Sequence, residues 1–201
     1  TGVVTLNEVP DFDTKPSYIF SILADDGVEF NDIVLKRVTL NVSNIDDTAP
    51  TIESAAIATI DENKGANQVV YTAIADDSKD VSDGFTFSLA EGSDSALIID
   101  AITGDVTLTD NPNYEAKPSY SFTVVATDLA GNTSVPKSVT LNINNLDEVA
   151  PVINSGDAAT AVDENSGVGK VIYTATATDS LDISAGISFS LSGDSDTALS
   201  I

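Results

Sequence analysis

The stretch Asn145-Leu146-Asp147-Glu148-Val149-Ala150-Pro151 decides how this chain folds, because Asn44-Ile45-Asp46-Asp47-Thr48-Ala49-Pro50 is a close copy of it. Pro151 lies 101 positions after Pro50 (151 − 50), and most other matching segments lie one position further apart. Such a period is too long for a solenoid unit of about 20–50 residues and fits a row of whole domains. The sequence therefore predicts a tandem array of domains whose joints carry carboxylates.

The composition excludes several classes of function. The 201 residues include 32 acids against 8 bases, a net charge of −24, which excludes nucleic acid as a partner and disfavours anionic membranes. Cysteine and histidine are absent, which excludes disulfides, thiolate zinc sites and Ser-His catalysis. No signal peptide and no membrane-spanning apolar run occur. Because methionine is also absent, we expect an internal part of a longer protein.

Apolar and polar residues alternate with a period of two in Ser119–Thr127 and Val139–Asn144, as is typical of half-buried antiparallel strands. Turn residues separate these from further expected strands at Ile52–Ala58, Gln68–Ala75, Gly84–Leu89, Ala96–Ile99 and Asp105–Thr109. About seven short strands per repeat predict an all-β fold, a tandem antiparallel Greek-key β-sandwich. The inward positions predict a core of Tyr71, Phe87, Leu89, Ile99, Val106, Tyr120, Phe122, Val124, Val139, Leu141 and Ile143.

The repeat also predicts the domain boundaries. Residues 1–48 match the later half of a repeat, residues 49–149 form a complete one, and residues 150–201 match the earlier half of the next. Neither half can cover its apolar face alone. We therefore expect the halves of different copies of the chain to complement each other head to tail. The alternative is that both halves fray and the chain stays monomeric.

Acidic residues gather in loops and at strand ends of the complete repeat. They are Asp61-Glu62-Asn63, Asp77 with Asp80, Asn113-Tyr114-Glu115, Asp128 and Asp147-Glu148. Oxygen ligands without nitrogen or sulfur suit calcium. A single acid of this kind is more often a turn former or a solvated charge. Many of these acids, however, recur one period away, as Asp11 with Asp13, Asp26, and Asp179 with Asp182, although recent duplication alone would give the same recurrence.

These motifs, in this order, resemble a cadherin repeat in its bacterial cadherin-like form, over nearly the full length of the complete unit. Asp61-Glu62-Asn63 is similar to the family's early Glu-Asn motif, and Asn145–Pro151 to its closing linker. Further matches are Ala75–Asp80, with one extra residue, Ile98–Val106 around a Thr-Gly turn, Asn111–Glu115, and the strand Ser119–Asp128. The resemblance implies a cadherin or immunoglobulin-like sandwich.

The resemblance also implies calcium ions (Ca2+) bound between successive repeats. At the first joint it implies the ligands Asp11, Asp13, Asp46, Asp47, Asp77, Asp80 and Asp128. At the second joint it implies Glu62, Glu115, Asp147, Glu148, Asp179 and Asp182. Asparagine replaces a family aspartate at positions 44, 113 and 145, so we expect one ion at the second joint to be weak or absent.

The leading functional hypothesis is a calcium-rigidified spacer in a long extracellular or cell-surface protein that serves cell adhesion or biofilm attachment. Its partners would be calcium, neighbouring repeats and a cell-surface protein or glycan. The alternative is a carbohydrate-binding β-sandwich module, for which Tyr114 and Phe12 are the aromatics to consider. An enzyme is not expected, because a carboxylate pair needs a cleft that a sandwich of this size does not offer.

Overall fold

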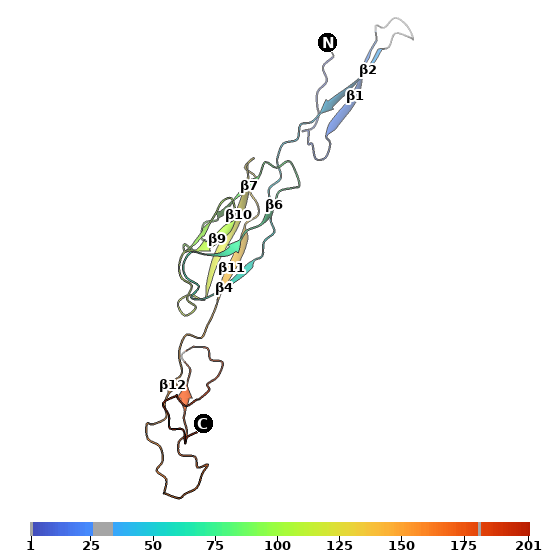
Figure 1. The fold of residues 1–201 in the computed structure, drawn as a ribbon. Coiled ribbons are helices and arrows are strands. Elements are labelled where there is room, and N and C mark those ends of the chain that lie inside the picture. The colour runs from blue at the N-terminus through green and yellow to red at the C-terminus, as the bar shows by residue number, and fades with distance from the viewer. Residues whose placement is uncertain (1, 26–33, 181) are drawn as a thin grey trace.

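The computed structural model describes residues 2–25, 34–180 and 182–201, and within these ranges it contains strands and no helix. The chain is elongated, and three parts follow one another from the N-terminus to the C-terminus (Figure 1). The first contains β1 (Ser17–Ala24) and β2 (Val34–Asn41), and the last contains β12 (Val152–Ile153) and β13 (Ala177–Thr178). No described segment forms a helix able to cross a membrane.

The central part is a sandwich with two main sheets. One sheet has the strand order β4 (Ile57–Asp61), β11 (Lys137–Asn144), β10 (Ser119–Asp128) and β7 (Phe85–Leu89). The other has the order β5 (Gln68–Thr72), β9 (Asp105–Leu108) and β8 (Leu97–Ile99). A short pair joins β3 (Thr51–Ile52) to β6 (Ala75–Asp76). The all-β sandwich expected from the alternating pattern is thus confirmed.

The core follows the period-two alternation along β10 and β11. Along β10 the side chains of Tyr120, Phe122 and Val124 are buried, and the residues between them face outward. Of the predicted core residues, only Leu89 and Ile99 are partly rather than fully buried, because each ends a strand at the edge of its sheet. The core also contains residues outside the predicted core list: Val70, Ala73, Leu97, Leu108 and Ala126.

Val70 shows why the alternation fails locally. Val70 and Tyr71 are neighbours in sequence, and both are buried. The pairing of β5 with β9 shifts register between Val69 and Tyr71, which is an irregularity of the β-bulge kind. An extra residue in one strand lets two consecutive side chains face the same side.

Two strands predicted as continuous are each divided in the structure. The segment 52–58 contains the end of β3 and the start of β4, and the segment 68–75 contains β5 and the start of β6. In both cases the chain changes its pairing partner. In the first segment β3 pairs with β6 while β4 pairs with β11, and in the second β5 pairs with β9 while β6 pairs with β3. The β4–β11 pair is parallel, unlike the antiparallel pairs that were expected. Both strands run toward the second joint, because the chain enters the repeat at one end and leaves it at the other (Figure 1).

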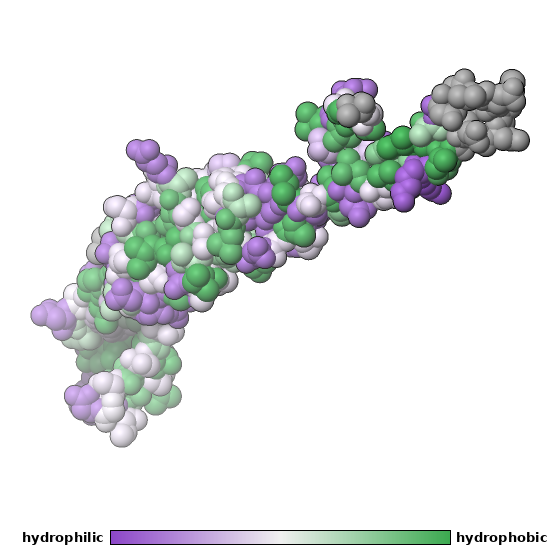
Figure 2. Space-filling model, turned by 90° about the horizontal axis from the view of Figure 1, so that it is seen from above, coloured by the Kyte–Doolittle hydropathy of each residue, from purple (hydrophilic) through white to green (hydrophobic). Residues whose placement is uncertain are grey.

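The outer parts repeat the local structure of the central repeat without its burial. Tyr18 pairs with Leu40 across β1 and β2, just as Tyr120 pairs with Leu141 across β10 and β11. Leu40 is nevertheless 40% exposed, whereas Leu141 is 0% exposed. Figure 2 shows hydrophobic side chains at the surface of the narrow part beside the grey atoms. In the part of the chain that the structure describes, no second sheet packs on the β1–β2 pair.

The C-terminal part shows the same contrast. The Tyr173 hydroxyl donates to the Gly156 carbonyl (2.5 Å) and is hydrogen-bonded to Ser155 Oγ (2.6 Å). Tyr71 makes the matching bonds to Ser54 Oγ (2.6 Å) and to the Ala55 carbonyl. Tyr173 is 42% exposed and Tyr71 only 8%, so these local contacts form without a complete core.

Gly104 offers a test of core packing. Its φ is +74°, and an added Cβ would lie 2.6 Å from the Ala73 carbonyl oxygen and 2.9 Å from the Phe87 ring. Gly131 also has positive φ, +99°, but no atom lies within 4 Å of its added Cβ. We expect Gly104→Ala to lower the free energy of unfolding by about 2–5 kcal/mol and Gly131→Ala by about 1 kcal/mol. Urea unfolding measures both, and equal effects would contradict the packing argument.

Candidate metal centres

The structure gathers six of the acids predicted at the first joint into two clusters. One contains Asp13, Asp47 and Asp80, and in each cluster the carboxylate oxygens lie within 4.8 Å of one another. The other contains Asp46, Asp77 and Asp128. Each cluster combines residues of the linker with residues of the central repeat, and the first also includes Asp13 from the turn before β1. The counterpart of Asp128 in the preceding part, Asp26, lies outside the described residues.

Hydrogen bonds to the central repeat hold the linker of the first joint in place. The Asp47 N–H donates to Asp80 Oδ2 (3.2 Å), and Asn44 Nδ2 donates to Asp80 Oδ1 (2.8 Å). Asn132 Nδ2 donates to the Asp46 carbonyl (3.1 Å) and to Asp128 Oδ2 (2.9 Å). Sequence reasoning missed Asn132, since Ala130-Gly131-Asn132 indicated only a turn. Its place just after Asp128 was the available signal.

Asp11 is the predicted ligand that the structure keeps out of both clusters. Its Oδ1 accepts the N–H groups of Asp13 (3.0 Å) and Thr14 (3.3 Å), which closes the turn before β1. Its counterpart Asn113 accepts the Ala116 N–H in the same way (2.7 Å). Asparagine and aspartate cap such a turn equally well, so the change of residue at this position does not by itself alter the cluster.

At the second joint Glu62, Glu115 and Glu148 form the third cluster. Glu62 directly follows β4 and is only 1% exposed. Its Oε1 accepts the Leu146 N–H (2.7 Å), and its Oε2 accepts the Tyr114 N–H (2.8 Å). One buried carboxylate thus ties the turn before β10 to the linker.

Asp147, Asp179 and Asp182 lie outside this third cluster. Asp182 Oδ2 accepts the Glu148 N–H (3.0 Å), which repeats the contact of Asp80 with Asp47. Asp179 Oδ2 accepts the Ser184 hydroxyl (2.6 Å), as Asp77 accepts that of Ser82. The two loops therefore have matching local contacts. Asp147 and Asp179 are the counterparts of Asp46 and Asp77, which form a cluster with Asp128 at the first joint. The position one repeat after Asp128 is not part of the 201-residue sequence.

The clusters crowd like charges. The pKa of Asp13 is raised by partial loss of contact with water and then by the charges of Asp80 and Asp47. The pKa of Asp46 is raised by the same loss and then by Asp128 and Asp77. At the second joint, partial desolvation followed by the charges of Glu62 and Glu115 raises the pKa of Glu148.

Hydrogen bonds from backbone N–H groups stabilise the ionised form of some of the acids. The pKa of Asp80 is lowered by the N–H groups of Val81 and Asp47, and that of Asp182 by those of Glu148 and Ile183. The pKa of Asp128 is also lowered. Burial acts to raise it, but the hydrogen bonds that Asn132 and nearby backbone groups donate outweigh the burial.

The donor set fits a hard divalent cation such as calcium. Every group in the three clusters is a carboxylate, and calcium prefers oxygen ligands. At the second joint the Asn145 Oδ1 is buried without a hydrogen-bond partner among the described residues. A buried carbonyl oxygen left unpaired is costly, and coordination to a cation would satisfy it.

Comparisons with known proteins agree with this architecture. Residues 56–144 are recognised as a Cadherin domain. Human Protocadherin Fat 1 is 28% identical over 186 residues, which is 89% of this chain and 4% of that protein. Zebrafish Protocadherin-19 is 31% identical over 153 residues, 70% of this chain and 14% of that protein. The chain thus spans a small fraction of these relatives. They are animal proteins and do not support the bacterial form expected from the sequence.

Solved structures show the same fold. Mouse clustered PcdhgC3 EC1-3 gives a TM-score of 0.58 at 18% identity, covering 70% of this chain and 47% of that chain. Mouse Cadherin-23 EC22-24 gives 0.56 at 22% identity, covering 86% and 56%. The chain therefore has the cadherin β-sandwich fold.

Glu148 provides a pH test of the charge crowding. Its folded pKa lies above the ordinary 4.5, so the ionised group destabilises the folded chain at neutral pH. That penalty disappears as pH falls through the folded pKa, and below 4.5 both states are protonated. In chelator, Glu148→Gln should raise the melting temperature at neutral pH and have no effect in strong acid. A gain that persists in strong acid would contradict this origin.

Proposed function

We propose that this chain is part of an extracellular protein in which calcium ions rigidify the joints between cadherin repeats, so that the repeats act as a spacer in cell-surface attachment. The observation that carries the proposal is the composition of the clusters. Each one combines linker acids with acids from an adjoining repeat, so an ion bound there would connect successive domains. The similarity to protocadherins supports an adhesive setting. A cell-surface protein or a glycan is the partner that we propose for it.

The proposed ligands are the members of the three clusters, together with Asp147, Asp179, Asp182 and the side-chain oxygen Oδ1 of Asn145. A bound divalent cation would supply positive charge where the carboxylates now repel one another. The chain's own contribution is to position these groups. Asp80 and Asp182 fix the linker through its N–H groups, and Glu62 fixes its start. Asp11 is left out of the proposed set because its carboxylate closes a turn.

The structure favours the spacer over a carbohydrate-binding module. Glycan sites present exposed aromatic rings; Tyr114 (37% exposed) and Phe12 (36% exposed) are exposed, but they lie at different joints and cannot line one site together. Both residues lie in turns at the joints, next to the acids Glu115 and Asp13.

Calcium should stabilise and extend the protein. Ligands that exist only in the folded chain shift unfolding by mass action, by about 0.4–1.4 kcal/mol per site when calcium is at about 1–10 times its dissociation constant. We expect dissociation constants of about 10⁻⁴–10⁻³ M, the range of extracellular modules. Differential scanning calorimetry should show a higher melting temperature in millimolar calcium than in chelator, and small-angle scattering should show a longer particle.

Substitutions identify the residues responsible. Glu115→Ala should reduce the calcium-dependent rise, and Asp147→Ala tests a linker acid outside the Glu62 cluster. Glu91→Ala is the matched control, since Glu91 is an exposed glutamate in a loop and belongs to none of the clusters. The proposal fails if the wild-type chain melts at the same temperature in calcium and in chelator.

We also propose that complementary halves of different copies cover the open faces of the outer parts. The late half, with β1 and β2, exposes apolar residues such as Leu40, and the early half exposes Tyr173. Adjoining sequence in a longer protein would compete for the same faces. Light scattering of the 201-residue chain should show mass that grows with concentration. A strictly monomeric particle whose halves are both protected from hydrogen exchange would contradict it.

A further inference from the structure

The side chain of Asn132, in the loop that follows β10, bridges the central repeat and the linker of the first joint. Its Nδ2 donates to the Asp46 carbonyl of the linker (3.1 Å) and to Asp128 Oδ2 of the repeat (2.9 Å). A primary amide nitrogen carries two hydrogens, so these bonds use both of them. Asp46 and Asp128 belong to the same carboxylate cluster, which also contains Asp77. One amide group therefore joins two members of this cluster.

The same loop fixes the orientation of the Asp128 carboxylate. Asp128 is 5% exposed, and its Oδ1 accepts the N–H groups of Gly131 (2.7 Å) and Asn132 (2.7 Å). The Asn132 side chain donates to the other oxygen, and the Asp128 N–H donates back to the Asn132 carbonyl (3.1 Å). A carboxylate has about four acceptor positions. The loop uses three of them, which leaves capacity for a cation.

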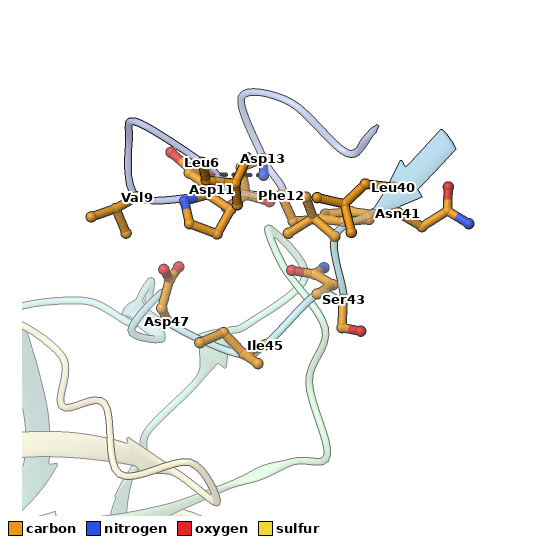
Figure 3. A pocket seen from close by; sticks show the side chains of 13 residues that line it. Leu6, Val9, Asp11, Phe12, Asp13, Leu40, Asn41, Ser43, Ile45 and Asp47 are labelled. Atoms are coloured by element: carbon orange, nitrogen blue, oxygen red, sulfur yellow. Dashed lines mark hydrogen bonds between the residues drawn. The ribbon is translucent and has the colours of Figure 1, made fainter. Parts of the chain in front are cut away.

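The two adjacent acids of the linker are anchored by different parts of the central repeat. Asp47 is directed toward the turn that carries Asp13 (Figure 3), and the two residues form a cluster with Asp80. The Asp47 N–H donates to the Asp80 carboxylate (3.2 Å). Asp46 belongs to the other cluster, and its carbonyl is held by Asn132, which lies 86 positions later in the sequence. Each linker acid is thus held through a group of its own backbone.

We propose that Asn132 is a positioning residue for cation binding at the cluster of Asp46, Asp77 and Asp128, an inference that rests on the proposed function. Its bond to the Asp46 carbonyl keeps the linker on the repeat, and its bond to Asp128 keeps that carboxylate in the cluster. The amide nitrogen is a donor only, so Asn132 acts through these two partners. Groups that hydrogen-bond to metal ligands fix their orientation, and their loss lowers metal affinity about 10–100-fold.

A positioning role differs from stabilisation of the loop alone. A side chain that only closes the loop raises the melting temperature equally in calcium and in chelator. A positioning residue also increases the rise that calcium causes, because binding needs the linker and Asp128 in place together. Loss of the Asn132 side chain should therefore weaken calcium binding at the first joint. The second joint, whose cluster contains Glu62, Glu115 and Glu148, should be unaffected.

The test is a calcium titration of the ¹⁵N-labelled 201-residue chain, followed by two-dimensional NMR. The Gly131 N–H, which donates to Asp128, reports the first joint. The Leu146 N–H, which donates to Glu62, reports the second joint. Asn132→Ala should raise the dissociation constant measured at Gly131 by about tenfold or more and leave the constant measured at Leu146 unchanged.

Two further variants test the role of the amide hydrogens. Asn132→Gln keeps these hydrogens on a longer side chain and should recover part of the affinity that Asn132→Ala loses. Asn142→Ala is the matched control, since Asn142 is an exposed asparagine of β11 and belongs to none of the clusters. It should change neither dissociation constant. The Leu146 signal in the same spectra shows that each variant is folded.

The outcomes separate this inference from the calcium proposal. If Asn132→Ala binds calcium at the first joint as tightly as the wild-type chain, the positioning role is overturned and the calcium function stands. A melting temperature that falls equally in calcium and in chelator, with unchanged affinity, also overturns it, because Asn132 then only closes the loop. An equal loss of affinity at Gly131 and Leu146 overturns it as well, since the effect is not local. If calcium shifts neither signal in the wild-type chain, both proposals fail.

Discussion

Repulsion between carboxylates at the ends of the sandwich is the constraint on which the joints depend. Acids from the linker and from the repeats lie close enough for their oxygens to share one site. Partial loss of contact with water, and then the charges of these neighbours, raise the pKa of Asp13, Asp46 and Glu148. A chain that places such charges together in the folded state gives up stability unless something compensates them.

The protein compensates part of this charge itself. Backbone N–H groups of the linker donate to Asp80 and Asp182, and both oxygens of Glu62 accept backbone N–H groups. These bonds hold the linker in a defined place, and the N–H groups of Gly131 and Asn132 donate in the same way to Asp128. Backbone N–H groups thus stabilise part of the negative charge at each joint, and the charge that remains suits a divalent cation.

The three parts of the chain separate local from long-range structure. Strand pairing, the tyrosine hydroxyl bonds and the asparagine turns recur in the outer parts with nearly the same geometry as in the central repeat. Burial does not recur, because it requires strands from the early half to pack on strands from the late half. Leu40 pairs with Tyr18, and Leu141 pairs with the equivalent Tyr120. Only Leu141 is buried, because a second sheet packs on it.

The sequence by itself determined the repeat, the strands of the late half, most of the core and the acids at the joints. Period-two alternation is a local property, and acids between strands necessarily fall in loops. Only the tertiary structure decided which acids meet. It left Asp11 in a turn, added Asn132 to the first joint and buried Glu62 against two N–H groups. It also decided that β4 runs parallel to β11 and that Val70 faces inward beside Tyr71. Strand direction and register depend on partners distant in sequence, and no local pattern of residues encodes them.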